Sequence, residues 1–267
     1  MSEPATNNSG CFTSLMVLLA AIFSSLVSAN GSAFTPLLPP QPTEIAMHVD
    51  LAPSVENFTS EELQLAADVI TKRLAGLALE PTSVEIVDGA LIRVGLPPLE
   101  NLDDVVQTLS SRGLLEFVDF SDIPDYPAWT GSEILTTGQG DHPISETAAP
   151  NPTTNQPFVT IISGTDIESA TAFLDTQFSQ WTVLITLSEA AGNTLGDYTR
   201  DVIGKPMAIV LDGKVLIAPV INQELGREAV IQGNFTEADT RRLAVQLGAG
   251  ALPFALTVQV IDGNFGR

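Results

Sequence analysis

The sequence is poor in cysteine, histidine, basic residues and aromatic residues. Its 267 residues include one cysteine, two histidines and 11 lysines and arginines, and 6% of them are aromatic. The single cysteine, Cys11, excludes a disulfide framework and a thiolate metal site within one chain. The 32 acidic residues give a formal net charge of -21. This charge argues against binding to nucleic-acid phosphates and against adsorption to an anionic membrane surface.

Residue groups with recognisable catalytic or metal chemistry are also missing. His48 and His142 lie far apart in the sequence, with no cysteine or second histidine near either, whereas a zinc site needs several ligands at recognisable spacing. No G-x-S-x-G elbow, phosphate-binding loop or dinucleotide fingerprint is present. We therefore expect a protein that is not an enzyme and that has no catalytic residues, no metal site and no cofactor.

An uncharged apolar run lies near the N-terminus. Residues 11–29 contain no charged residue, and the run is about as long as the ~20 residues of a bilayer-spanning helix. The letters "VSA" before Asn30 also resemble a signal-peptide cleavage site after Ala29. A single uncleaved anchor is the favoured interpretation of residues 1–30, and a cleaved signal is the alternative. The proline-rich residues 31–42 are typical of a stiff, extended spacer.

Residues 43–120 carry the periodicities of a small α+β unit. Thr59 and Glu62 stand in capping-box relation at the start of a helix, and an Asp-Gly pair at Asp88 predicts a hairpin turn. A fourth strand is expected over residues 114–120. The resulting order is β-α-β-β-α-β, which is the ferredoxin-like pattern.

Residues 121–157 contain six prolines and show no periodicity. This composition predicts a long loop or a connection between two units. Beyond it, Thr165 and Glu168 stand in a second capping-box relation, and the apolar spacing predicts a helix over residues 165–178. The strand that follows is expected to place Trp181 in the core.

The stretch "MAIVLDGKVLIAPVI", residues 207–221, predicts a hairpin. Asp212 and Gly213 form its turn, so we interpret Asp212 as a turn residue and not as a catalytic aspartate. The two strands are apolar on both faces, which is typical of a sheet that is covered on both sides. Pro219 restricts the second strand to an edge or a bulge.

A last helix is expected shortly before the C-terminus. Asn234 or Thr236 is its N-cap, and Gly248 and Gly250 end it before Pro253. The C-terminal stretch "FALTVQVID" then predicts a final strand.

Four stretches together carry a family resemblance: "IISGTDIESATAF", "MAIVLDGKVLIAPVI", "IQGNFTEADTRRLA" and "GAGALP". With them the chain resembles the first periplasmic domain of the SecD/SecDF family of protein-export membrane proteins. The resemblance implies an α+β fold with a ferredoxin-like base over 43–120, a SecD-like head over 158–250, and a C-terminal strand over 251–267 that returns to the base. The family-motif residues, taken as structural markers only, are Asp212, Gly213, Pro219, Gly233, Phe235, Gly250 and Pro253.

The resemblance also implies a function. It predicts a membrane-anchored extracytoplasmic module, secreted if it is cleaved after Ala29, that binds translocating or unfolded polypeptide and assists Sec-dependent translocation. Sec translocon subunits are expected partners, and nucleic acid is not. The family carries a proton-conducting transmembrane bundle after this domain, and no second apolar span follows here, so we expect action without such a bundle. The alternative is a stand-alone envelope scaffold that reuses the fold without an export role.

The expected peptide-binding feature is an apolar groove or a free sheet edge. An extended peptide can occupy either one. Pro219 and residues 121–157 are the candidates for exposing such an edge.

Overall fold

The computed structural model describes residues 47–79, 83–140, 145, 147–233 and 235–261. The predicted anchor and spacer, together with His142 and Asn234, lie outside these ranges. The described elements belong to one compact unit and form three antiparallel sheets and four α-helices. None of the helices in the described ranges is both long enough and apolar enough to cross a membrane.

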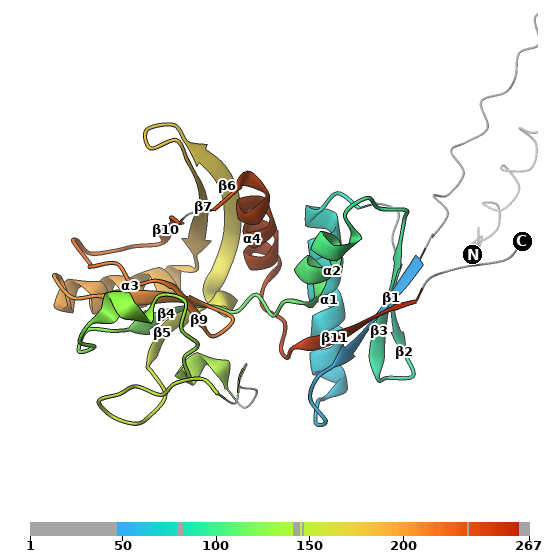
Figure 1. Ribbon diagram of the computed structural model, residues 1–267, viewed down its shortest axis with the longest axis horizontal. Helices are drawn as coiled ribbons and strands as arrows, with labels where there is room; N and C mark the ends of the chain where they lie inside the picture. The colour runs from blue at the N-terminus through green and yellow to red at the C-terminus, as the bar shows by residue number, and fades with distance from the viewer. Residues whose placement is uncertain (1–46, 80–82, 141–144, 146, 234, 262–267) are drawn as a thin grey trace, which may run out of the picture. The chain divides into compact units, whose positions relative to one another are not determined.

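One sheet with two helices forms the part that we call the base. The sheet has the order β11-β1-β3-β2, and α1 and α2 pack against it (Figure 1). The capping box of Thr59 and Glu62 is confirmed, and the Asp88 turn is confirmed by positive φ angles at Asp88 and Gly89. The elements of the base are β1 (Met47–Pro53), α1 (Ser60–Gly76), β2 (Ser83–Val87), β3 (Leu91–Leu96), α2 (Leu102–Ser110) and β11 (Leu256–Ile261).

The predicted fourth strand of the base is wrong. Strand β4 (Leu115–Asp119) does not pair with any base strand in the described structure, but with β5 and β8. The fourth strand of the base sheet is β11, which pairs with β1 in antiparallel register. The local order of elements could not reveal this, because both neighbours of β4 come from later in the chain. The base segment predicted over 43–120 therefore ends before β4.

Two sheets and two helices form the part that we call the head. The sheets have the orders β5-β4-β8-β9 and β10-β7-β6. The elements after β4 are β5 (Thr160–Ser163), β6 (Ile167–Asp175), β7 (Gln180–Leu187), α3 (Glu189–Asp201), β8 (Met207–Leu211), β9 (Lys214–Ile217), β10 (Glu228–Ile231) and α4 (Glu237–Ala249), with 3-10 helices at Tyr126–Trp129, Thr137–Gln139 and Gly164–Asp166.

Strand β8 shows why the hairpin predicted over residues 207–221 is apolar on both faces. Met207 and Ile209 point into a hydrophobic cluster that includes residues of α3 and α4. Ala208 and Val210 point the other way, into a second cluster. The sheet is therefore covered on both sides, as the sequence predicted.

The described residues between 121 and 157 cover the second face of this sheet. They leave from β4 and return into β5, so they do not connect the base to the head. The ring centroid of Phe158 lies 4.9 Å from that of Phe120 and 5.5 Å from that of Trp129. Ile134 and Phe158 are fully buried. The described residues of this segment together with Phe158, which we call the cover, thus have their own share of the hydrophobic core.

The helix predicted over residues 165–178 is wrong, because this segment forms strand β6. The strand pairs with β7 along its length, and the capping box here joins Ser163 and Asp166 around a short 3-10 turn. Ala170 and Leu174 are four positions apart, so they share a face in a strand as well as in a helix. The pairing with β7 decides between the two, and it is a tertiary effect.

Candidate functional site

The chain crosses between base and head twice. The outgoing crossing, residues 111–114, runs from α2 to β4, and the returning crossing, residues 250–255, runs from α4 to β11. Arg73 of α1 binds both crossings. Its side chain is fully buried. Thr108 and Leu109 lie in the last turn of α2, and their carbonyls accept hydrogen bonds from Nη1 at 2.9 and 3.1 Å. Nη2 donates to the carbonyls of Arg112 on the outgoing crossing and Gly250 on the returning one, at 3.0 and 3.3 Å. Helix C-terminal carbonyls favour a cation in this place.

Burial lowers the pKa of Arg73 to about 10. The guanidinium therefore stays charged at neutral pH, and its charge is used to bind backbone carbonyls. Gly113 lies against it, because a Cβ at Gly113 would lie 2.7 Å from Arg73 Nη2. Arg73 is thus a structural residue that the sequence did not reveal, since its partners lie far away in the chain.

Asp212 has a second role besides its turn. Its φ of 49° and the φ of 75° at Gly213 confirm the turn. In addition, its Oδ1 accepts a hydrogen bond from the backbone N–H of Leu114 at 2.8 Å, where the outgoing crossing enters β4. Burial raises the pKa of Asp212, and the backbone donors together with Arg73 and Arg112 oppose that rise. The carboxylate therefore fixes the backbone of the crossing.

A buried carboxyl group also fastens the cover to the head sheet. The Oε1 atom of Glu116, on β4, accepts hydrogen bonds from the hydroxyls of Thr136 and Thr160 at 2.6 and 2.7 Å. Its Oε2 has no hydrogen-bond partner among the described residues. Burial raises the pKa of Glu116. Gly138 of the cover lies against Oε1, and there is no room for a Cβ there.

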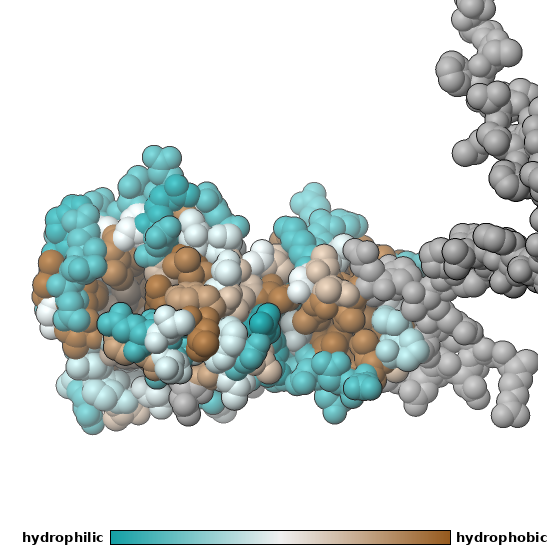
Figure 2. All heavy atoms as spheres, turned by 90° about the horizontal axis from the view of Figure 1, so that it is seen from above, coloured by the Kyte–Doolittle hydropathy of each residue, from teal (hydrophilic) through white to brown (hydrophobic). Residues whose placement is uncertain are grey.

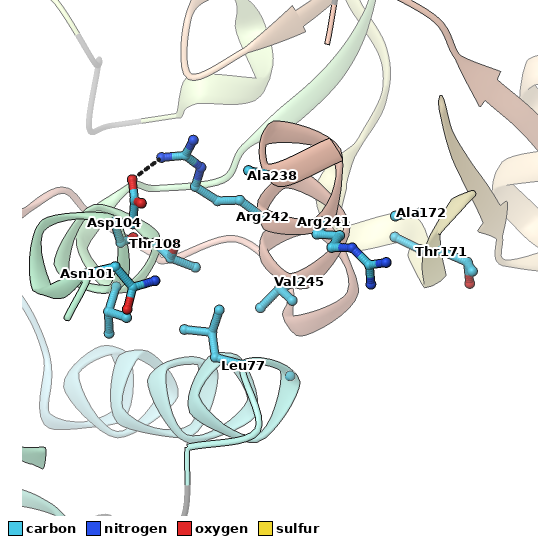
Figure 3. Close-up of a pocket in the computed structure, with 13 residues that line it drawn as sticks. Leu77, Asn101, Asp104, Thr108, Thr171, Ala172, Ala238, Arg241, Arg242 and Val245 are labelled. Carbon is cyan, nitrogen blue, oxygen red and sulfur yellow. Dashed lines mark hydrogen bonds and ion pairs between the residues drawn. The ribbon is translucent and has the colours of Figure 1, made fainter. Parts of the chain in front are cut away.

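A groove of about 470 Å³ lies between α1, α2, α4 and β6 (Figure 3). Its floor is apolar and includes Val245. Arg242 bonds to Asp104 across the groove at 3.3 Å, and Arg241 pairs with Glu237 at 2.7 Å on α4. The charged side chains that line the groove are thus each engaged in an ion pair. No cluster of three or more possible metal ligands occurs in the described part of the chain.

Trp181 is not a core residue, contrary to the prediction. It is half-buried at the start of β7. The guanidinium carbon of Arg241 lies 5.5 Å from the centroid of its ring, an arrangement that allows a cation–π interaction. The ring therefore packs under a long side chain from α4 at the margin of the sheet.

The edge of β9 is occupied by the cover. Gly131 donates to the carbonyl of Val215 at 2.8 Å, Val215 donates to Ser132 at 3.0 Å, and Ile134 donates to Gly213 at 2.8 Å. The prediction that the cover exposes a sheet edge is therefore wrong, because the cover closes this one.

The outer edge of β10 is open among the described residues. Leu187 of β7 donates to the carbonyl of Arg227 at 2.7 Å, so in an antiparallel ladder residues 227, 229 and 231 turn their backbone groups toward β7. The N–H and C=O groups of Glu228 and Val230 then point away from the sheet. No described residue bonds to them.

The face of the β10-β7-β6 sheet that carries Val230, which we call the open face, is partly exposed: Leu184 and Thr186 are half-buried there, and Thr182 is fully buried. Helix α4 packs along β6 (Figure 1) and contributes Leu243 and Leu247 to the cluster on the other face. On the open face, Val230 of β10 lies opposite Leu184 of β7, which in turn lies opposite Thr171 of β6. Val230 is 44% exposed. The free edge therefore borders a partly apolar sheet surface.

The remaining family-motif residues lie in separate turns. Pro219 is exposed just beyond β9, and Gly233 lies against the half-buried ring of Phe235. Gly250 ends α4 with a φ of 93°. Pro253 is half-buried between two residues of the base core. They do not converge on one site.

Comparisons with known proteins cover most of the chain. The SecDF P1 head subdomain family matches residues 144–254. Protein translocase subunit SecDF from Thermus thermophilus is 29% identical over 230 residues, which cover 80% of this chain and 30% of SecDF. Protein translocase subunit SecD from Rhodobacter capsulatus is 29% identical over 202 residues, which cover 73% of this chain and 34% of SecD.

Two solved structures share the fold. SecDF in its super-membrane-facing form aligns with a TM-score of 0.66 and 27% identity, over 85% of this chain and 32% of that chain. A chain from work on SecDF as a membrane component that enhances protein export aligns with a TM-score of 0.64 and 30% identity, over 80% of this chain and 98% of that chain. The chain thus spans about a third of the two full-length relatives, and it belongs to the SecD/SecDF family.

Proposed function

We propose that this chain is a membrane-attached, extracytoplasmic module that assists protein export by binding extended polypeptide along the open edge of β10. The observation that carries the proposal is the row of outward backbone groups at Glu228 and Val230. An extended chain can add to such an edge through main-chain hydrogen bonds. Because every polypeptide has these backbone groups, the contact suits partners of varied sequence.

The proposed module acts without catalysis. Three ionisable side chains bind structural partners: Arg73 and Asp212 hold the crossings, and Glu116 holds the cover. The names of the relatives, which are protein translocase subunits, support an export role.

Exposed apolar side chains on the head support contact with unfolded polypeptide. Figure 2 shows brown, apolar surface between hydrophilic patches. Leu174 and Phe178, at the end of the β6–β7 hairpin, are 46% and 62% exposed. We propose them as secondary contacts, because an unfolded segment held at the β10 edge presents apolar side chains that native proteins bury.

Site-specific cross-linking tests the proposal. A photoreactive residue replaces Val230 in the full chain, and an unfolded export precursor is added. Val159 is the matched control, since it is a second exposed valine of the head, at 53% exposure. We expect cross-links from position 230 well above those from position 159. Equal or absent cross-linking at position 230 contradicts the proposal.

Co-purification from membranes tests the partners. Sec translocon subunits and precursor are expected to be enriched over an unrelated acidic domain of similar charge. Enrichment of a folded envelope protein without any precursor would instead favour the scaffold alternative.

A further inference from the structure

The β10 edge carries a side-chain pattern in addition to its open backbone. Glu228 and Val230 point to the open face of the sheet, where they lie opposite Thr186 and Leu184 of β7. Ala229 and Ile231 point to the other face, and Ile231 is fully buried there. A strand added next to β10 would therefore place its side chains in line with two cross-strand rows of the open face. One row ends at the carboxylate of Glu228, and the other ends at the apolar side chain of Val230.

The carboxylate of Glu228 has no ion pair among the described residues. It is exposed. The neighbouring Arg227 is already engaged, because its Nη2 binds Glu168 at 2.7 Å and its Nε donates to the carbonyl of Leu187 at 3.0 Å. The described open face carries no lysine or arginine on β6, β7 or β10. The exposed carboxylate of Glu228 is thus available to pair with a positive charge on a strand that adds at this edge.

We propose that the β10 edge selects extended segments with an apolar residue followed two positions later by lysine or arginine. In antiparallel pairing the apolar side chain lies opposite Val230 and the basic side chain lies opposite Glu228. Antiparallel ladders are the more stable kind per residue, and opposite charges in directly facing positions stabilise them. The proposal rests on the proposed function and specifies its substrate class.

The same carboxylate disfavours the wrong occupants. An acidic segment would place a like charge opposite Glu228, which destabilises the pair. A second copy of this chain, which pairs β10 with β10, would bring two Glu228 carboxylates to the same edge. A charge on an edge strand is a common protection against such self-association. The net charge of -21 attracts basic segments over longer distances.

The experiment uses two labelled ten-residue peptides that are identical except at one position. One contains valine-threonine-lysine in its centre, and the other contains valine-threonine-glutamate. Fluorescence anisotropy with the full chain gives both affinities. We expect the lysine peptide to bind about fivefold more tightly than the glutamate peptide at low salt, with the difference reduced at high salt.

Charge reversal at the site provides the decisive comparison. Glu228→Lys should invert the preference between the two peptides. Glu100→Lys is the matched control, because it makes the same change of net charge at an exposed residue of the base, and it should preserve the preference. Amide hydrogen exchange locates the binding, since the bound lysine peptide should protect the amides of Glu228 and Val230.

The possible failures can be distinguished. If both peptides bind equally well, or if Glu228→Lys leaves their order unchanged, the charge selection is wrong while edge binding remains. If neither peptide binds and position 230 gives no cross-links to precursor, both proposals are wrong.

Discussion

The edge strands β9 and β10, which belong to different sheets of the head, differ in what lies beside them. The chain closes the edge of β9 with its own cover, through backbone hydrogen bonds to Val215 and Gly213. It leaves the edge of β10 open and places the exposed Glu228 and Val230 there. Exposed edges invite uncontrolled pairing, and proteins usually cover or shorten them. The cover thus closes one edge, whereas the other, only four residues long, is the edge to which we assign polypeptide binding in the proposed function.

The largest expected effect is the loss of the cover. Phe158→Ala removes a fully buried ring that stacks on Phe120, so we expect it to lower the free energy of unfolding by about 3–5 kcal/mol. The matched control is Phe178→Ala, which removes a ring that is 62% exposed and should change stability by about 0.5 kcal/mol or less. Urea unfolding measures both. Similar losses in the two variants would show that the cover contributes little to the core.

The second effect concerns Glu116, which joins the cover to β4 and β5. Burial raises its pKa in the folded chain above the usual value of 4.5, so the folded state binds a proton more tightly than the unfolded state does. Its contribution is therefore most favourable below pH 4.5 and is lost as pH rises through the folded pKa. Each unit by which the two pKa values differ changes the free energy of unfolding by about 1.4 kcal/mol.

Glu116→Gln tests this pH dependence. The amide keeps a carbonyl oxygen for Thr136 and Thr160 but cannot ionise. We expect the variant to be at least as stable as the parent near pH 7 and to have a flatter stability profile above pH 4.5. Thermal unfolding from pH 4 to pH 8 measures the difference between the two proteins. Parallel profiles would contradict a raised pKa at Glu116.

The smallest expected effect is a difference in amide exchange between the two edges, which is measured first in the parent protein. The amide of Val215 donates to Ser132 of the cover, whereas the amide of Val230 points outward. Amide hydrogen exchange should therefore be slow at Val215, which exchanges only when the cover opens, and fast at Val230. Phe158→Ala should accelerate exchange at Val215 and leave Val230 unchanged. Slow exchange at Val230 in the free protein would mean that another group already occupies the β10 edge.

Much of the local structure could be predicted from the sequence. Capping boxes and Asp-Gly turns depend on neighbouring residues, so Thr59 with Glu62, and Asp212 with Gly213, were identified correctly. Strand β6 was missed because Ala170 and Leu174 satisfy both periodicities, and its pairing with β7 is not visible locally. Strand β4 was assigned to the base for a related reason, since its partners follow it in the chain.

The candidate site was less accessible to prediction. Pro219 predicts an edge strand or a bulge; β9 is an edge strand that ends at Ile217, before Pro219, and nothing in the sequence showed that residues 131–134 lie along it. The openness of β10 depends on the order of strands in the sheet, which is a property of the whole head. Arg73 was overlooked for the same reason, because its acceptors lie in α2 and in both crossings.

The place of β11 in the base has a consequence for synthesis on the ribosome. Asp50 of β1 faces Gln259 of β11, so β11 cannot lie beside β1 until residues 256–261 have been translated. All elements from β4 to α4 emerge before that moment and form a contiguous segment that can fold first. A compact insert brings its two ends together, which reduces the entropy cost of the final long-range pairing.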